Sequence, residues 1–283
     1  MAPFRAACVQ MRSSRSPAEN VATAEALIRE AAAAGAVYVQ TPEMTNLLER
    51  DRAALFDKIA LEEADQGLAT LKGLARELGI TLHIGSFAIR RPDGAVANRG
   101  FVIGPDGTVA ARYDKIHMFD VDLANGESWR ESATYQPGDV AVVTDLADIR
   151  LGLAICYDLR FPHLFRGHAK AGAGLLSVPA AFTRQTGEAH WHVLLRARAI
   201  ENGAFVVAAA QAGQHEDGRE TYGHSLIVDP WGRVLAEAAT EPGIIVAEID
   251  PALVDEARGR IPALKNERAF APSTAPRLVE SVA

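Results

Sequence analysis

The segment LGLAICYDLRFP (residues 151–162) contains the change of pattern that decides the fold class. Its first five residues are apolar without alternation, which is typical of a strand buried on both faces. From about Phe161 to Ala171 the sequence instead has the spacing of a helix. One of the chain's two cysteines, Cys156, therefore stands at a predicted turn from a strand into a helix.

The same alternation continues on both sides of this segment. Apolar runs predict strands at 4–11, 36–40, 80–89, 140–146, 174–179, 204–210, 223–229, 233–238 and 243–250. Helical patterns lie between some of them, at 17–35, 67–79 and 187–203. Two Pro-Asp-Gly turns, at 92–94 and 105–107, add antiparallel hairpins. The sequence therefore predicts an α/β protein with mixed sheets, covered on both faces.

Composition limits the organisation and the partners of the protein. The 283 residues are 48% hydrophobic and contain no Ser/Gly-rich linker, so we expect a single domain over 1–283, with a polar C-terminal tail from about residue 262. A net charge of −7 argues against a nucleic-acid partner. Two cysteines give no disulfide framework, and we find neither a secretory signal nor a membrane span. We therefore expect a cytoplasmic protein that acts on a small molecule.

Cys156 could be a nucleophile or a buried small hydrophobic residue, and a lone cysteine more often has the second role. A free thiol has a pKa near 8.5 and is only a few per cent ionised at neutral pH, so a nucleophile needs a base or a cation nearby. Candidates are Glu43 in VYVQTPEMTN, Lys115 in RYDKIHMFD and Glu131 in WRESATYQPGD, although each alone is an ordinary loop residue. Cys8, inside a predicted strand, is interpreted as a core residue.

Three segments together, TPEMTN, YDKIHMFD and ICYDLRFP, resemble the nitrilase or carbon–nitrogen hydrolase superfamily in their order and separation. The resemblance extends over nearly the whole chain, from AACVQM to Ile261-Pro262. It implies a four-layer α-β-β-α sandwich, in which two mixed β-sheets are flanked by helices. It also implies a homodimer or higher homo-oligomer, joined through the helix after Cys156 and the C-terminal segment.

The resemblance assigns catalytic roles to four side chains. Glu43 takes the thiol proton of Cys156, and the thiolate attacks an amide carbonyl to form a thioester. Lys115 and the backbone N–H of Tyr157 hold the oxyanion, and Glu131 orients Lys115 and the substrate. Glu43 then protonates the departing ammonia and activates the water that hydrolyses the thioester. This chemistry needs no metal and no organic cofactor.

Within the superfamily, the segments at 117–139, 179–215 and 222–234 resemble the branch that contains deaminated glutathione amidase and omega-amidase. AAAQAGQH (208–215) favours the first, and an omega-amidase acting on α-ketoglutaramate or α-ketosuccinamate is the alternative. The substrates of both carry an α-keto acid, so a cation or hydroxyls must bind a carboxylate. Arg160 is our first candidate, followed by Thr183 and Thr186, although Arg160 could equally form a structural salt bridge with Asp158 or another acid.

Other interpretations of these residues stay open at this point. A non-catalytic scaffold could share the fold, although it has no need of all four catalytic side chains. His163, His168 or His224 could pair with Cys156, but nothing in the sequence places any of them beside it. His190 and His192 are two positions apart, face different sides of a helix and cannot bind one metal ion together.

Overall fold

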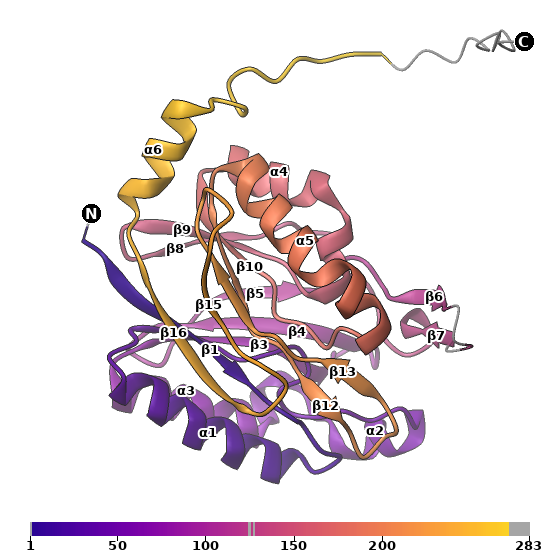
Figure 1. Ribbon diagram of the computed structural model, residues 1–283. Helices are drawn as coiled ribbons and strands as arrows, with labels where there is room; N and C mark the ends of the chain where they lie inside the picture. Colours follow the sequence, from indigo (N-terminus) through magenta and orange to yellow (C-terminus); the bar gives the residue numbers. More distant parts are fainter. Residues whose placement is uncertain (1, 124–125, 127, 272–283) are drawn as a thin grey trace, which may run out of the picture.

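Two six-stranded sheets form the centre of the computed structural model, which describes residues 2–123, 126 and 128–271 (Figure 1). The first sheet has the order β16-β1-β2-β3-β4-β5. Its strands are β1 (Phe4–Gln10), β2 (Tyr38–Gln40), β3 (Thr81–Arg90), β4 (Val96–Ile103), β5 (Val109–Asp114) and β16 (Gly243–Ile249). β1, β2 and β3 are parallel, whereas β3, β4 and β5 form the antiparallel meander predicted from the two Pro-Asp-Gly turns.

The second sheet has the order β15-β14-β11-β10-β9-β8. Its strands are β8 (Val143–Leu146), β9 (Ile149–Leu153), β10 (Ala173–Ser177), β11 (Phe205–Ala208), β14 (Leu226–Val228) and β15 (Val234–Glu237). β9, β10 and β11 are parallel, and the outer pairs are antiparallel. Both sheets are therefore mixed, as the sequence predicts.

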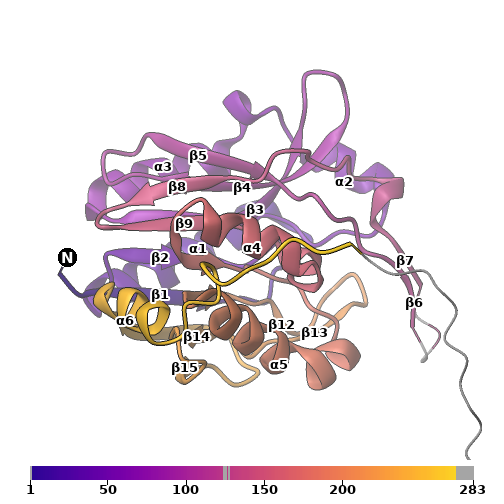
Figure 2. The same ribbon diagram turned by 90° about the horizontal axis from the view of Figure 1, so that it is seen from above.

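Helices cover the outer face of each sheet. α1 (Pro17–Ala33) and α3 (Gln66–Leu78) lie under the first sheet, and α4 (Pro162–Lys170) and α5 (Arg184–Asn202) lie over the second (Figures 1 and 2). α3 shows why these segments are helical: Asp65 caps its first turn through the Leu68 N–H, and left-handed Gly79 ends it. Leu68, Leu71 and Leu74 are buried on one face. The result is the predicted α-β-β-α sandwich.

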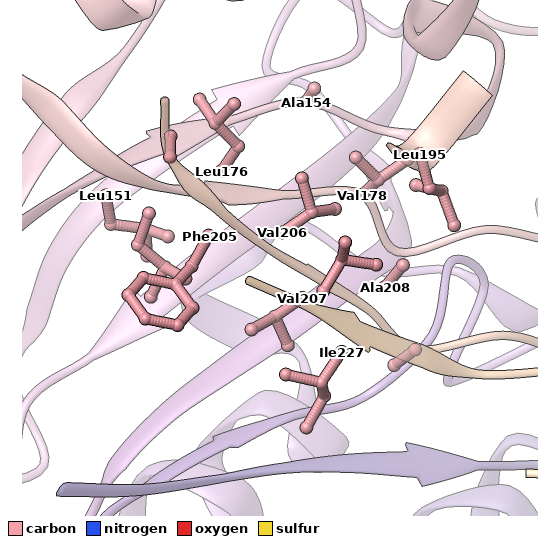
Figure 3. Packing of buried hydrophobic residues seen from close by; sticks show 14 of the residues in the cluster. Leu151, Ala154, Leu176, Val178, Leu195, Phe205, Val206, Val207, Ala208 and Ile227 are labelled. Atoms are coloured by element: carbon pink, nitrogen blue, oxygen red, sulfur yellow. The ribbon is translucent and has the colours of Figure 1, made fainter. Parts of the chain in front are cut away.

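The largest hydrophobic cluster fills the space between the sheets and the space under α4 and α5. Figure 3 shows members of this cluster from four neighbouring strands and from α5, with Leu151, Leu176, Val206, Ile227 and Leu195 among them. A second cluster lies between the first sheet and its two helices. Cys8 is fully buried in β1, as predicted. No helix in the described ranges combines the length and the apolar character needed to cross a membrane.

Several short elements have no clear signal in the sequence. They are α2 (Arg52–Lys58), the 3-10 helices η1 (Glu62–Ala64) and η2 (Glu131–Ala133), and the hairpins β6–β7 (Asp120–Asp122, Ser128–Arg130) and β12–β13 (Ala212–Gln214, Glu220–Tyr222). In contrast, the 3-10 helix η3 (Cys156–Arg160) forms at the predicted turn from strand to helix, and α6 (Ala252–Arg260) is a short helix expected after Pro251. The strands of these hairpins have three residues each, too few to show alternation. α5 begins at Arg184, three residues before the predicted start. Residues 272–283 of the predicted tail lie outside the described part of the chain.

Candidate active site

Glu43 follows β2, in a loop that is held from both sides. Thr45 Oγ1 donates to the Pro42 carbonyl (2.7 Å), and Gln211 Nε2 donates to the Glu43 carbonyl (3.0 Å). Gly85 lies directly under the loop, where a Cβ atom would come within 2.2 Å of the Thr41 carbonyl oxygen. A side chain at position 85 would therefore push the loop away from β3, and glycine is needed for this close approach.

Lys115 follows β5 and reaches Glu43 and Glu131 at the same time. Its side chain is 2% exposed, and Nζ lies 2.9 Å from Glu43 Oε1 and 2.8 Å from Glu131 Oε2. The Phe119 N–H also donates to Glu131 Oε2, at 2.7 Å. The structure therefore brings together three residues that the sequence separates by 72 and 16 positions.

Asn98, on β4, joins the two carboxylates and was not anticipated from the sequence. Its Nδ2 donates to Glu43 Oε1 (2.8 Å) and to Glu131 Oε1 (3.1 Å). Its Oδ1 is buried without a hydrogen-bond partner among the described residues. Asn98 stands in the middle of an ordinary hairpin strand, so no local motif distinguishes it from a structural residue.

Cys156 lies at the strand-to-helix turn after β9, as predicted, with a left-handed backbone (φ +48°) that is uncommon for a residue with a side chain. The next residues form η3. Tyr157 is its second residue, so its N–H is one of those that a helix start leaves without an intrahelical acceptor. The thiol lies beside the Glu43 carboxylate in the same pocket, and the Ala181 N–H donates to Glu43 Oε2 at 2.8 Å.

The fully buried Asp158 carboxylate holds the turn in place. It accepts hydrogen bonds from the Ile155 N–H (2.8 Å) and the Tyr113 hydroxyl (2.7 Å). It also contacts both the N–H (3.1 Å) and Nδ1 (2.6 Å) of His117, two residues after Lys115. The salt bridge between Arg160 and Asp158 that we weighed is therefore absent, because Asp158 points inward to these partners.

The electrostatics set the resting protonation states of the site. Burial raises the pKa of the Cys156 thiol well above its usual value, and the neighbouring Glu43 carboxylate raises it further. Burial also disfavours the Glu43 carboxylate, but Lys115 and hydrogen bonds from Asn98 and Cys156 outweigh burial, so the pKa of Glu43 is lowered. Glu131 and Glu43 raise the pKa of Lys115 against the effect of burial. The resting site therefore contains a neutral thiol, an ionised Glu43 and a cationic Lys115.

These side chains lie in a pocket of about 250 Å³. We call Glu43, Asn98, Lys115, Glu131 and Cys156 the pocket base, in which Asn98 stands behind the carboxylates and the other four line the cavity. Thr183 and Thr186, both predicted to bind substrate, also line the pocket, and their hydroxyls lie 2.8 Å apart.

Arg160 does not line the pocket. Its guanidinium lies 5.3 Å from the Phe182 ring centroid and 6.0 Å from that of Tyr157, two rings that do line it. Arg160 also donates to His190 Nδ1 at 3.3 Å. Binding of the substrate carboxylate by Arg160 stays a prediction, and the aromatic wall stands between this guanidinium and the cavity.

Other arginines reach the cavity. Arg50 and Arg219 line it and lie 4.4 and 4.7 Å from the ring of Trp129, and we call these three residues the pocket mouth. Within the described part of the chain, Arg50 has no ion pair, and the buried Arg219 Nε has no hydrogen-bond partner. Arg219 Nη2 lies 3.4 Å from Asp217 Oδ2. No local pattern in the sequence predicts that these distant residues meet.

Residues 5–259 match the carbon-nitrogen hydrolase family. Over 270 residues the chain is 40% identical to the deaminated glutathione amidase of Synechocystis sp., which covers 94% of this chain and 98% of that protein. Over 268 residues it is 39% identical to the omega-amidase of Homo sapiens, which covers 95% and 96%.

Solved structures agree with the fold. The NitFhit protein of C. elegans superposes with a TM-score of 0.88 and 36% identity, over 95% of this chain and 66% of that one. A mutant amidase from Nesterenkonia sp. superposes with a TM-score of 0.78 and 26% identity, over 94% of both chains, and carries the acetamide moiety of fluoroacetamide at its active site cysteine. These matches favour an enzyme over the non-catalytic scaffold. The chain therefore belongs to the carbon–nitrogen hydrolase family and is an amidase of that family.

Proposed function

We propose that the protein hydrolyses a small carboxylate-bearing amide through a thioester on Cys156, with deaminated glutathione as its first candidate substrate. The observation that carries this proposal is the contact of one buried thiol with an ionised carboxylate that is itself paired with Lys115. A structural role does not account for this cluster. Burying the charged side chains of Glu43, Lys115 and Glu131 together costs free energy, which a purely structural site has no reason to spend.

The first half of the reaction forms the thioester. As Cys156 Sγ attacks the amide carbon, the thiol proton moves to Glu43, so the thiolate forms only when substrate is present. Lys115 Nζ and the Tyr157 N–H stabilise the charge on the carbonyl oxygen. The carbon–nitrogen bond then breaks, and Glu43 returns the proton to the leaving nitrogen.

The second half releases the acid. Glu43 takes a proton from a water molecule, the new oxygen–carbon bond forms and the carbon–sulfur bond breaks. The proton then returns from Glu43 to Cys156 Sγ, which restores the resting site. Glu131 helps to keep Lys115 cationic, because its Oε2 lies 2.8 Å from Nζ.

The leaving group depends on which amide is cleaved, and this corrects the expectation that ammonia always leaves. α-Ketoglutaramate is a primary amide and releases ammonia. Deaminated glutathione has a peptide nitrogen at the same place and releases cysteinylglycine. Both give α-ketoglutarate, so the two activities differ in the amine and not in the acid.

The pocket mouth supports an anionic substrate. The pocket base contains two carboxylates and only one ammonium group. It therefore repels a substrate carboxylate that would lie next to the scissile amide. The mouth instead presents Arg50 without an ion pair and Arg219 with an unused buried N–H, as stated above for the described residues. A carboxylate at the end of the substrate far from the amide therefore fits the mouth.

Mass spectrometry with product analysis tests the proposal. The enzyme is given deaminated glutathione or α-ketoglutaramate, and α-ketoglutarate, ammonia and cysteinylglycine are measured separately. Glu43→Gln removes the base for the water step and should slow turnover by about 10²- to 10⁴-fold. Any acyl group that this variant retains should map to Cys156. An acyl group on another residue would contradict the mechanism, and faster release of ammonia than of cysteinylglycine would favour the omega-amidase alternative.

A homo-oligomer stays part of the proposal, as do one domain and a cytoplasmic location. α4 and α5 lie side by side, and the tail contacts α4 through Glu267 and Lys170 (2.8 Å). Three large apolar side chains are exposed on α5 and the tail: Val193 (68%), Ile200 (53%) and Phe270 (88%). Exposed apolar side chains of this size suit contact with a second copy of the chain. Sedimentation velocity at micromolar concentration should show a dimer or larger, and a monomer would remove this part.

A further inference from the structure

Two histidines and a glutamate from separate parts of the chain meet on the outside of the second sheet. His192 lies on α5, His224 lies between β13 and β14, and Glu237 ends β15. His192 Nε2 and His224 Nδ1 each lie 2.9 Å from the same oxygen, Glu237 Oε1. The three potential ligand atoms all lie within 4.8 Å of one another. We call these three residues the His-Glu cluster.

The ring of His224 is held in place before any ligand arrives. It stacks on Tyr222, with centroids 4.3 Å apart and planes inclined by 25°. Its backbone is left-handed (φ 53°), and its carbonyl accepts a 2.7 Å hydrogen bond from Trp191 Nε1, on the residue before His192. The backbone strain at His224 is therefore compensated by contacts that aim its Nδ1 at Glu237.

The charge of the cluster favours a cation. Among the described residues, Glu237 forms no ion pair with lysine or arginine. The carboxylate therefore faces two imidazoles and no lysine or arginine, so its charge stays available to a metal cation.

We propose that the His-Glu cluster binds a divalent transition-metal ion of the Zn²⁺ class through His192 Nε2, His224 Nδ1 and Glu237. Two imidazole nitrogens and a carboxylate oxygen are a ligand set that Zn²⁺ and Co²⁺ accept, with a fourth position left for water. An ion with bonds of about 2.0 to 2.1 Å fits between the ligands once the imidazoles close in slightly. The His192 and His224 side chains are 31% and 24% exposed, which leaves room for this movement.

The sequence hides this site because its ligands are far apart. His190, two positions before His192, contacts Arg160 instead of the cluster. The partner of His192 is instead His224, from a segment that only the fold brings to α5. Among the described residues, no other group of three histidine, cysteine, aspartate or glutamate side chains has this geometry.

A bound ion would connect α5 to β15 and to the segment beside the pocket. The Tyr222 N–H donates to the carbonyl of Phe182 at 2.9 Å, and Phe182 lines the pocket. The ion therefore stabilises one wall of the pocket without touching the substrate. This inference does not depend on the proposed function.

Titration of the full chain with Zn²⁺ and Co²⁺ tests the site. The Cys156→Ala background is used, so that the pocket thiol cannot bind the ions. Isothermal titration should show one Zn²⁺ per chain, and Co²⁺ should give d–d absorption without thiolate charge-transfer bands. His192→Ala should weaken Zn²⁺ binding at least about 100-fold, because one of three ligands is lost. His190→Ala, two residues away on the same helix, should bind as the background does.

A second variant separates a lost ligand from a lost fold. Glu237→Gln can still accept hydrogen bonds from both imidazoles but is a poor metal ligand. Its circular dichroism spectrum and its metal-free melting temperature should match the background, while its melting temperature no longer rises with added Zn²⁺. Equal Zn²⁺ affinity in the His192, Glu237 and His190 variants, or no saturable binding in the background, would overturn the proposal.

Discussion

The pocket base and the pocket mouth lie in one cavity but differ in how completely their charges are paired. In the base, Lys115 Nζ contacts two carboxylates, and each of those carboxylates accepts further hydrogen bonds from Asn98 and from backbone N–H groups. In the mouth, the described partners leave Arg50 without an ion pair and Arg219 Nε without an acceptor.

The difference in charge pairing indicates that the pocket base carries out the reaction and that the pocket mouth selects the substrate. A buried cluster whose charges are all paired holds its geometry, and a charged group in it gains a new partner only when a reacting atom replaces one of the existing ones. Side chains with unused donors keep their interactions for a ligand. We therefore expect changes in the base to affect kcat and changes in the mouth to affect KM.

The largest expected effect comes from Cys156→Ala. Without the nucleophile no thioester forms, and amide hydrolysis should fall by about 10⁴-fold or more. Cys156→Ser should not restore it, because a hydroxyl loses its proton far less readily than a thiol. Cys8→Ala is the matched control: it removes the other cysteine from the core, costs about 1 kcal/mol of stability and leaves turnover intact. Near-normal turnover in Cys156→Ala would remove the mechanism.

Asn98→Leu should have the next largest effect, through the position and the pKa of Glu43. The substitution removes a hydrogen bond to each carboxylate, and turnover should fall about 10- to 100-fold. Because Asn98 helps to lower the pKa of Glu43, the acid limb of kcat/KM should also move to higher pH. Asn202→Leu changes another buried amide outside the pocket and should cost stability without moving that limb. If the acid limb of kcat/KM does not move in Asn98→Leu, Asn98 only packs in the protein and does not set the pKa of Glu43.

Arg219→Gln tests the mouth and should have a smaller effect. We expect KM for an α-keto acid amide to rise about tenfold, the value of one hydrogen bond to a charged group, with kcat nearly unchanged. A neutral amide of similar length should be unaffected. Arg130→Gln is the control, because Arg130 lines the same pocket but its Nη2 lies 2.9 Å from both Asp122 oxygens, whereas Arg219 Nη2 lies 3.4 Å from Asp217 and its Nε has no acceptor among the described residues. An equal rise in KM for the anionic and the neutral amide would contradict a role of the pocket mouth in binding the substrate carboxylate.

The smallest expected effect is that of pH near neutrality. Glu43 has a pKa below its usual 4.5, and Cys156 and Lys115 have pKa values well above their usual 9.0 and 10.5, so none of the three titrates between about pH 6 and 8. The rate should be level in that range. A free-thiol titration inside it, followed by alkylation of Cys156, would contradict the neutral resting thiol.

The same shifts predict how these groups change stability with pH. The contribution of Glu43 is present above pH 4.5 and is lost as the pH falls through its lower folded pKa. Those of Cys156 and Lys115 are present below pH 9.0 and 10.5 and are lost as the pH rises through their folded values. Urea denaturation curves measured on both sides of neutrality should show both losses.

What could be predicted from the sequence was local in nature. The strand-to-helix change at Cys156, the long helices and the Pro-Asp-Gly hairpins are patterns within short segments. Glu43, Lys115 and Glu131 were identified only because their segments resemble a family. Their convergence with Cys156 at the pocket base matches that expectation, and their catalytic roles stay proposals. Asn98 and Arg219 could not be found, because their importance depends on contacts between distant segments.

Arg160 shows the limit of a local argument most clearly. It is four residues from Cys156 and was a reasonable candidate for binding a carboxylate. η3, however, directs Asp158 inward and Arg160 behind the rings of Tyr157 and Phe182. The direction of each side chain on a short 3-10 turn depends on which residue accepts the buried hydrogen bonds, here Asp158. Spacing in the sequence does not predict this.

The pairing of the first and last strands has a consequence for synthesis of the chain. β1 lies inside the first sheet, because β16 pairs with it in continuous register from Phe4–Ile249 to Gln10–Gly243. During translation β1 emerges early, yet one of its edges stays without a partner until residue 249 has left the ribosome. That open edge could pair with a neighbouring nascent chain. The first sheet is therefore complete only after β16, its last strand in the sequence, has been made.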